Sequence, residues 1–64
     1  MPQGTVKFFN QSKGFGFITD EDSQKDIFVH VSGLQDNIRD NDRVSYKIID
    51  DQKGSKAIEV KLIN

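Results

Sequence analysis

The sequence predicts a small all-β fold, and a closed barrel in particular. Five short segments rich in β-branched or aromatic residues alternate with clusters of turn-forming residues. No segment repeats its apolar residues with the 3.6-residue period of a helix. Because five strands without a covering helix must still hide their edges, we expect the sheet to curl up and close on itself.

The predicted strands follow one another along the chain with one long interruption. They are Gly4 to Asn10, Phe15 to Thr19, Asp26 to Val31, Arg43 to Ile49 and Lys56 to Ile63. The connections are rich in Asp, Asn, Ser, Lys and Gly and comprise residues 10–14, 20–25, 32–42 and 50–54. The third connection is the longest, and its sequence is irregular.

Alternation gives each of the last two strands one apolar face. Val44, Tyr46 and Ile48 share a face of the fourth strand, and Ile58, Val60 and Leu62 share a face of the fifth. We expect both faces to line the core.

The second and third strands have apolar residues on both faces. Ile18, Ile27 and Val29 are natural core residues, so the aromatic residues between them should point outward. These outward residues are Phe15, Phe17 and Phe28, together with His30. Gly16 has no side chain, so another group could approach the backbone closely there. The pattern alone also allows the reverse arrangement, with the rings in the core and the aliphatic residues in the second layer of a sandwich.

Length and composition narrow the class of protein. We expect residues 1–64 to form a single domain. The chain has no cysteine, so we expect no disulfide and no thiolate metal site, and we also expect no metal, no cofactor and no small-molecule substrate. No apolar run approaches the ~20 residues of a membrane span, and the first residues lack signal-peptide character. We therefore expect a cytoplasmic protein that does not enter a membrane.

Charge and aromatic residues are unevenly distributed. The net charge of −1 argues against a generally basic nucleic-acid binder. However, residues 1–18 contain Lys7 and Lys13 and no acid, and all five phenylalanines lie within the first 28 residues. Exposed flat rings beside lysines suit unpaired bases, which stack on the rings while the phosphates meet the ammonium groups.

Three motifs in order indicate a family. Residues 4–10 are Gly-Thr-Val-Lys-Phe-Phe-Asn, residues 13–18 are Lys-Gly-Phe-Gly-Phe-Ile, and residues 26–30 are Asp-Ile-Phe-Val-His. The last two look like the first and second ribonucleoprotein motifs, and nearly the whole chain resembles the bacterial cold-shock domain proteins. The resemblance implies a five-stranded antiparallel oligonucleotide-binding barrel (OB-fold) that binds single-stranded RNA and DNA with little sequence preference. It also implies an RNA chaperone of the stress response that melts RNA secondary structure and could affect transcription or translation. We expect a monomer.

The resemblance implies a nucleic-acid-binding face as well. Carried over position by position, this face comprises Lys7, Phe8, Asn10, Lys13, Phe15, Phe17, Asp26, Phe28, His30, Lys53 and Lys56. Phe8 and Phe9 cannot both belong to it, because neighbouring residues of a strand point to opposite faces. We assign Phe8 to the ligand and Phe9 mainly to the flank of the barrel.

Three departures from the family pattern bear on affinity. Phe8 stands where most members have Trp, and Val31 stands where bacterial members commonly have Phe. The connection 32–42 is shorter than usual and lacks an aromatic residue, which leaves Ile38 and Arg39 as the only candidates to replace the family's loop aromatic. We expect micromolar to high-nanomolar affinity, weaker than that of relatives with Trp and the extra rings.

Several polar residues have two interpretations. Asp26 could accept hydrogen bonds from a base or pair with a nearby lysine. His30 suits stacking or a hydrogen bond to a base, because no nucleophile or companion ligand accompanies it for catalysis or metal binding. The alternative is a surface histidine without a function. The acidic cluster at residues 20–22 is typical of a solvated turn. We therefore expect no enzymatic activity.

An alternative function is protein interaction by a small SH3-like barrel that grips a proline-rich peptide with its aromatic patch. Such a groove needs Tyr and Trp, whose polar tips bond the peptide carbonyls. This chain has no Trp and a single Tyr, and Tyr46 alternates with the predicted core. Phenylalanine beside lysine favours bases over a peptide.

Overall fold

Five strands and one short 3₁₀ helix are present in residues 2–52 and 54–63, which are the residues that the computed structural model describes. The elements are β1 (Gln3–Asn10), β2 (Phe15–Asp20), β3 (Asp26–His30), η1 (Val31–Gly33), β4 (Arg43–Asp51) and β5 (Gly54–Leu62). All five predicted strands are confirmed, and their ends shift by no more than two residues.

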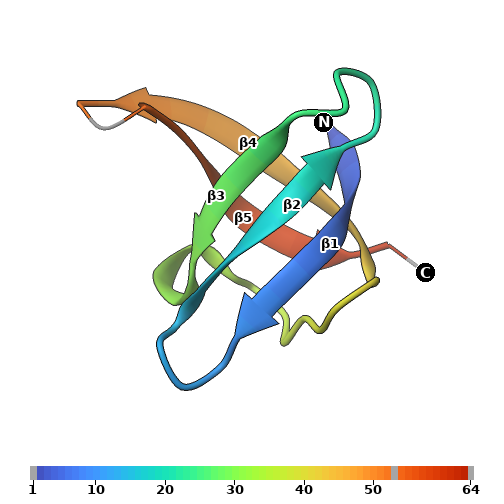
Figure 1. Ribbon diagram of the computed structural model, residues 1–64, viewed down its shortest axis with the longest axis vertical. Coiled ribbons are helices and arrows are strands. Elements are labelled where there is room, and N and C mark those ends of the chain that lie inside the picture. Colours follow the sequence, from blue (N-terminus) through green and yellow to red (C-terminus); the bar gives the residue numbers. More distant parts are fainter. Residues whose placement is uncertain (1, 53, 64) are drawn as a thin grey trace.

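The strands form a closed barrel in the order β1-β2-β3-β5-β4, with β1, β2 and β3 making the wall that faces the reader in Figure 1. Antiparallel ladders join all neighbours except β3 and β5, which pair in parallel over Phe28↔Lys56 and Val29↔Ala57. Closure hides the strand edges within the barrel, as the absence of a covering helix predicted.

The core is aliphatic on β2 and β3, and the rings of these strands point outward. Ile18, Ile27 and Val29 are buried, whereas Phe15, Phe17 and Phe28 are only partly buried. The rest of the core comprises Val6, Phe9, Ile38, Val44, Tyr46, Ala57 and Val60, with Leu34 packed against it. The structure therefore excludes the reverse arrangement with the phenylalanines of β2 and β3 inside.

Gly16 is a place where β1 and β2 approach each other closely. Its α-carbon faces inward, and a β-carbon there would clash with the Phe8 carbonyl oxygen and lie 2.7 Å from the Phe9 α-carbon. The close approach predicted at Gly16 therefore comes from β1 of the same chain, not from a ligand.

The predicted inner faces of β4 and β5 are correct only in part. Val44, Tyr46 and Val60 are buried, but Ile48 and Leu62 are each 41% exposed. Tyr46 faces two residues of β5, since the register shifts between Ser45↔Lys61 and Lys47↔Ile58. This β-bulge moves the inward position from Ile58 to Ala57, so simple alternation is wrong for the start of β5. Ile48 is exposed although its partner in the β4–β5 ladder, Ala57, is buried.

Asp20 is a buried structural residue, which corrects its assignment to a solvated turn. It is 7% exposed, and its carboxylate accepts hydrogen bonds from the Tyr46 hydroxyl and from Ser23, whose backbone nitrogen lies 2.9 Å away. The Tyr46 hydroxyl and the Ser23 amide lower the pKa of Asp20. Burial, together with the Asp20 carboxylate, raises the pKa of Tyr46. This network ties β4 to the β2–β3 loop.

We expect Tyr46→Phe to lower the free energy of unfolding by about 1–3 kcal/mol at neutral pH, because it removes one donor to a buried carboxylate. Because folding lowers the pKa of Asp20, its ionised carboxylate stabilises the folded protein fully at pH values above the ordinary aspartate pKa of about 3.9. This stabilisation is lost as the pH falls through the pKa that Asp20 has in the folded protein. The difference in the free energy of unfolding between the parent protein and Tyr46→Phe should therefore become smaller as the pH falls. Urea unfolding at about pH 7 and about pH 3 measures it. A constant difference would contradict a bond to the charged carboxylate.

Gly16→Ala should destabilise the barrel by about 1–3 kcal/mol, because the methyl group can be placed only by moving β1 away from β2. Thermal and urea unfolding measure this loss. Ser12→Ala, an alanine placed at an exposed turn residue, is the control and should change stability by less than about 0.5 kcal/mol. Equal stability of the two variants would contradict the close contact.

Candidate nucleic-acid interface

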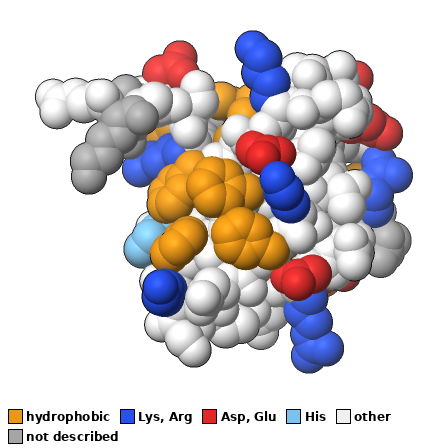
Figure 2. All heavy atoms as spheres, viewed as in Figure 1, with side chains coloured by type: hydrophobic (Ala, Val, Ile, Leu, Met, Phe, Trp, Pro, Cys, Tyr) orange, Lys and Arg blue, Asp and Glu red, His pale blue; other side chains and the backbone are white. Residues whose placement is uncertain are grey.

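The outer side of the β1-β2-β3 wall presents side chains in two rows that run across the strands. Cross-strand pairing aligns Phe8 with Phe17, Phe17 with Phe28, and Phe28 with Lys56 of β5. A second row aligns Asn10 with Phe15, and Phe15 with His30. Figure 2 shows a group of hydrophobic side chains over these strands, with Lys or Arg side chains around it.

The phenylalanine face, defined as Phe8, Phe15, Phe17 and Phe28, is a continuous aromatic surface. Ring centroids lie 5.6 Å apart for Phe8 and Phe17, 5.9 Å for Phe17 and Phe28, and 6.0 Å for Phe15 and Phe28. The tilted, edge-on and offset arrangements suit the ring quadrupoles. Each ring keeps part of its surface in solvent, and Phe8 is 37% exposed.

A β-bulge at Lys7 turns Phe8 outward. The β1–β2 register shifts between Val6↔Ile18 and Phe8↔Phe17, which leaves Lys7 as the extra residue. With Val6 inward, uninterrupted alternation would also send Phe8 inward and Phe9 outward. The bulge reverses this, so Phe9 is buried and Phe8 joins the phenylalanine face, in agreement with the assignment made from the sequence.

The loop before β4 supports β1 from the side opposite β2. The carboxylate of Asp40 accepts the Phe9 backbone N–H at 3.0 Å, and the Gln11 side chain donates to the Ile38 carbonyl. The Ile38 side chain is fully buried, so it cannot replace an aromatic residue on the surface of this loop. Arg39 is exposed and remains the candidate there.

Lys7 forms an ion pair with Asp26 at the border of the phenylalanine face. The ammonium nitrogen lies 3.0 Å from the carboxylate, and the Thr19 hydroxyl donates to the other carboxylate oxygen at 3.3 Å. The Lys7 hydrogen bond and charge lower the pKa of Asp26. Of the two interpretations of Asp26, the structure shows the lysine pair. Both side chains stay substantially exposed.

His30 and Asn10 are oriented by their neighbours. The Ser32 backbone N–H donates to Nδ1 of His30 at 3.2 Å, so the neutral ring has its proton on Nε2. Oδ1 of Asn10 accepts the Lys13 backbone N–H at 3.0 Å and holds the turn between β1 and β2. The Oδ1 atom of Asn10 is thus already used in a hydrogen bond within the turn.

The other lysines predicted for this site are Lys13, Lys53 and Lys56. Lys13 is exposed in the turn after β1, and Lys56 lies beside Phe28 at the end of its row. Lys53 lies outside the described residues.

Within the described part of the chain, no three His, Asp or Glu side chains are placed to hold a metal ion. Among the same residues there is no helix long and apolar enough to cross a bilayer.

A closed five-stranded barrel with flat rings and lysines on one wall is typical of the small nucleic-acid-binding barrels. A family model described as the 'Cold-shock' DNA-binding domain matches residues 2–63. The chain therefore belongs to the cold-shock domain family and is a nucleic-acid-binding protein of the bacterial cold-shock type.

Relatives agree with this assignment over nearly the whole chain. Cold shock-like protein CspC of Escherichia coli K12 is 48% identical over 65 residues, which cover 95% of this chain and 94% of the relative. Cold shock-like protein CspE of the same organism is 48% identical over 62 residues, covering 91% and 90%. The solved structure "drosophila Unr CSD456" superposes with a TM-score of 0.81 at 27% identity, covering 98% of this chain and 26% of that one.

The ion pair predicts a titration shift that can be measured directly. The Asp26 carboxyl should titrate below the ordinary aspartate value of about 3.9, and Lys7→Gln should move its pKa upward. Carbon-detected NMR of the side-chain carboxyl measures both values. Lys25→Gln, a lysine change at the residue preceding Asp26, is the control and should leave this pKa in place. An unchanged pKa in Lys7→Gln would contradict the pairing.

Proposed function

We propose that the protein binds single-stranded RNA and DNA on the phenylalanine face as a monomeric single domain. The observation that supports this most strongly is the row Phe8–Phe17–Phe28–Lys56, in which three neighbouring rings end at a lysine. Successive unpaired bases stack on such rings, while the lysines at the border contact phosphates. The proposed contacts are the eleven residues identified from the sequence, including Lys13, His30 and Lys53.

Preference for single strands follows from access to the base faces. In a duplex the bases are stacked on one another and cannot reach the rings. A protein that binds only the melted state shifts the equilibrium toward it by mass action, without ATP and without a catalytic step. The protein would thus act in the cytoplasm as an RNA chaperone that destabilises RNA secondary structure, with effects on transcription or translation.

The affinity should be moderate. Stacking contributes about 1–3 kcal/mol per base, and ordering a flexible strand offsets part of the sum over the four rings. Val31 is 49% exposed and offers an aliphatic surface in place of a further ring. Micromolar to high-nanomolar dissociation constants are therefore expected.

The peptide-binding alternative finds less support. Tyr46 is fully buried and bonded to Asp20, so it cannot offer a polar-tipped ring to a peptide. Membership of the cold-shock domain family also favours nucleic acid.

Fluorescence anisotropy of a dye-labelled oligothymidine of about seven nucleotides tests the proposal. Saturable binding is expected, with a matched duplex binding poorly. The log-log salt slope should lie near −2 to −3 if about three or four lysines contact phosphates. The double variant Phe17→Ala/Phe28→Ala should lose binding.

Leu62→Ala is the matched control, because it also removes an exposed apolar side chain but lies outside the phenylalanine face. It should bind like the parent protein. Circular dichroism confirms that each variant is folded. Absence of binding by the folded parent at tens of micromolar, or equal binding by the double variant, would overturn the proposal.

A further inference from the structure

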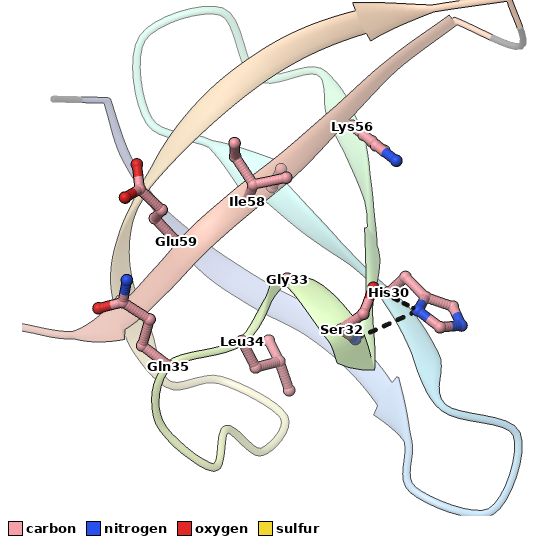
Figure 3. Close-up of a pocket in the computed structure, with 9 residues that line it drawn as sticks. His30, Ser32, Gly33, Leu34, Gln35, Lys56, Ile58 and Glu59 are labelled. Carbon is pink, nitrogen blue, oxygen red and sulfur yellow. Dashed lines mark hydrogen bonds between the residues drawn. The ribbon is translucent and has the colours of Figure 1, made fainter.

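A cavity opens where β3 and β5 separate. Their parallel pairing ends at Val29↔Ala57, and a bridge between Leu34 and Val60 joins the two segments again. Between these points η1 passes close to β5, since a β-carbon on Gly33 would lie 2.9 Å from the Ala57 carbonyl oxygen. A cavity of about 200 Å³ lies beside this crossing (Figure 3). That volume is below the range of drug-sized ligand sites, roughly 300–1,000 Å³, and suits a single ring system.

The cavity continues both rows of the phenylalanine face. The row through Phe28 ends at Lys56, and the row through Phe15 ends at His30, and both end residues line the cavity. A strand that follows either row, as proposed above, would meet the cavity at the end of that row. This continuity favours a base of the bound strand as the occupant.

The lining changes in character from one end to the other. Figure 3 shows His30 and Ser32 at one end, Glu59 and Gln35 at the opposite end, and Ile58 and Leu34 between them. An apolar middle accepts the face of a ring, and the polar far end can bond its edge.

Glu59 is held at the cavity by the bulge in β5. It is the extra residue opposite Tyr46, and its φ of 51° lies in the left-handed region that residues other than glycine rarely adopt. Bulges re-aim side chains, and unusual backbone conformations gather at functional sites. The Glu59 carboxylate also lies 3.7 Å from the Lys47 ammonium, with both side chains substantially exposed.

We propose that this cavity binds a guanine base of the single strand and that Glu59 recognises its edge. A carboxylate only accepts hydrogen bonds and repels phosphate, so the groups of a bound strand that Glu59 can contact favourably are the N–H donors of a base. Guanine presents two adjacent donors, N1–H and the exocyclic N2–H, which a carboxylate can accept together. In adenine, cytosine, thymine and uracil, each donor group on this edge has an acceptor beside it instead. The inference rests on the proposed function of the phenylalanine face.

The test uses labelled oligothymidines of about seven nucleotides in which guanine replaces thymine at one position at a time. One position should bind about fivefold to tenfold more tightly than thymine, the low end of a bidentate base contact. Inosine at that position, which lacks the 2-amino group, should give an intermediate gain. Glu59→Gln should reduce the guanine gain to less than about twofold.

Glu21→Gln is the matched control, since Glu21 also pairs with a cation, Arg43, and its change alters net charge equally. It should keep the full guanine gain. Three results would overturn the guanine site: no position at which guanine tightens binding, an equal gain with inosine, or a gain that remains in Glu59→Gln. Binding of plain oligothymidine in the same experiment would still uphold the proposed function. If the folded protein binds no oligonucleotide at all, both proposals fail.

Discussion

The contact on which the structure depends is the close approach of β1 to β2 at Gly16. The absence of a side chain there lets the Phe8–Phe9 backbone lie against β2. The same contact brings Phe8 beside Phe17, with ring centroids 5.6 Å apart. A larger residue at Gly16 would thus disturb the closure of the barrel and the continuity of the phenylalanine face together. The stability of the barrel and the continuity of the phenylalanine face therefore depend on the same steric requirement at Gly16.

Two β-bulges then determine where the functional side chains lie. The bulge at Lys7 exchanges the positions of Phe8 and Phe9, and it lets Lys7 reach Asp26 on β3. The bulge at Glu59 returns Val60 to the core and leaves Glu59 beside the cavity. In each case the extra residue of the bulge is charged: Lys7 lies at the border of the phenylalanine face, and Glu59 lines the cavity. Both bulges therefore change which side chains of their strands face outward.

Most of the fold could be predicted from local patterns, and several errors arise where a bulge or a contact between distant segments determines the structure. The strands and the outward phenylalanines of β2 and β3 follow from alternation over short, regular segments. Ile58 was misplaced because alternation holds only where the register is unbroken. Ile48 and Leu62 are exposed although their ladder partners, Ala57 and Val44, are buried. Asp20 was misplaced because its partner, Tyr46, lies 26 residues away, and no local pattern shows such a bond. The cavity beside η1 was missed for the same reason, since residues of two distant segments form it.

The distribution of carboxylates bears on how an acidic chain could bind nucleic acid on the phenylalanine face, as we propose. Among the described residues, four aspartates accept backbone N–H groups of loops and strand ends, namely Asp20, Asp36, Asp40 and Asp42. Irregular segments lack ladder partners for these groups, and short acidic side chains supply them. Asp26 is the carboxylate at the border of the phenylalanine face, and Lys7 pairs with it. The net charge of −1 therefore counts many acids that hold loops together, and the potential that a strand meets depends on the few charges beside the rings.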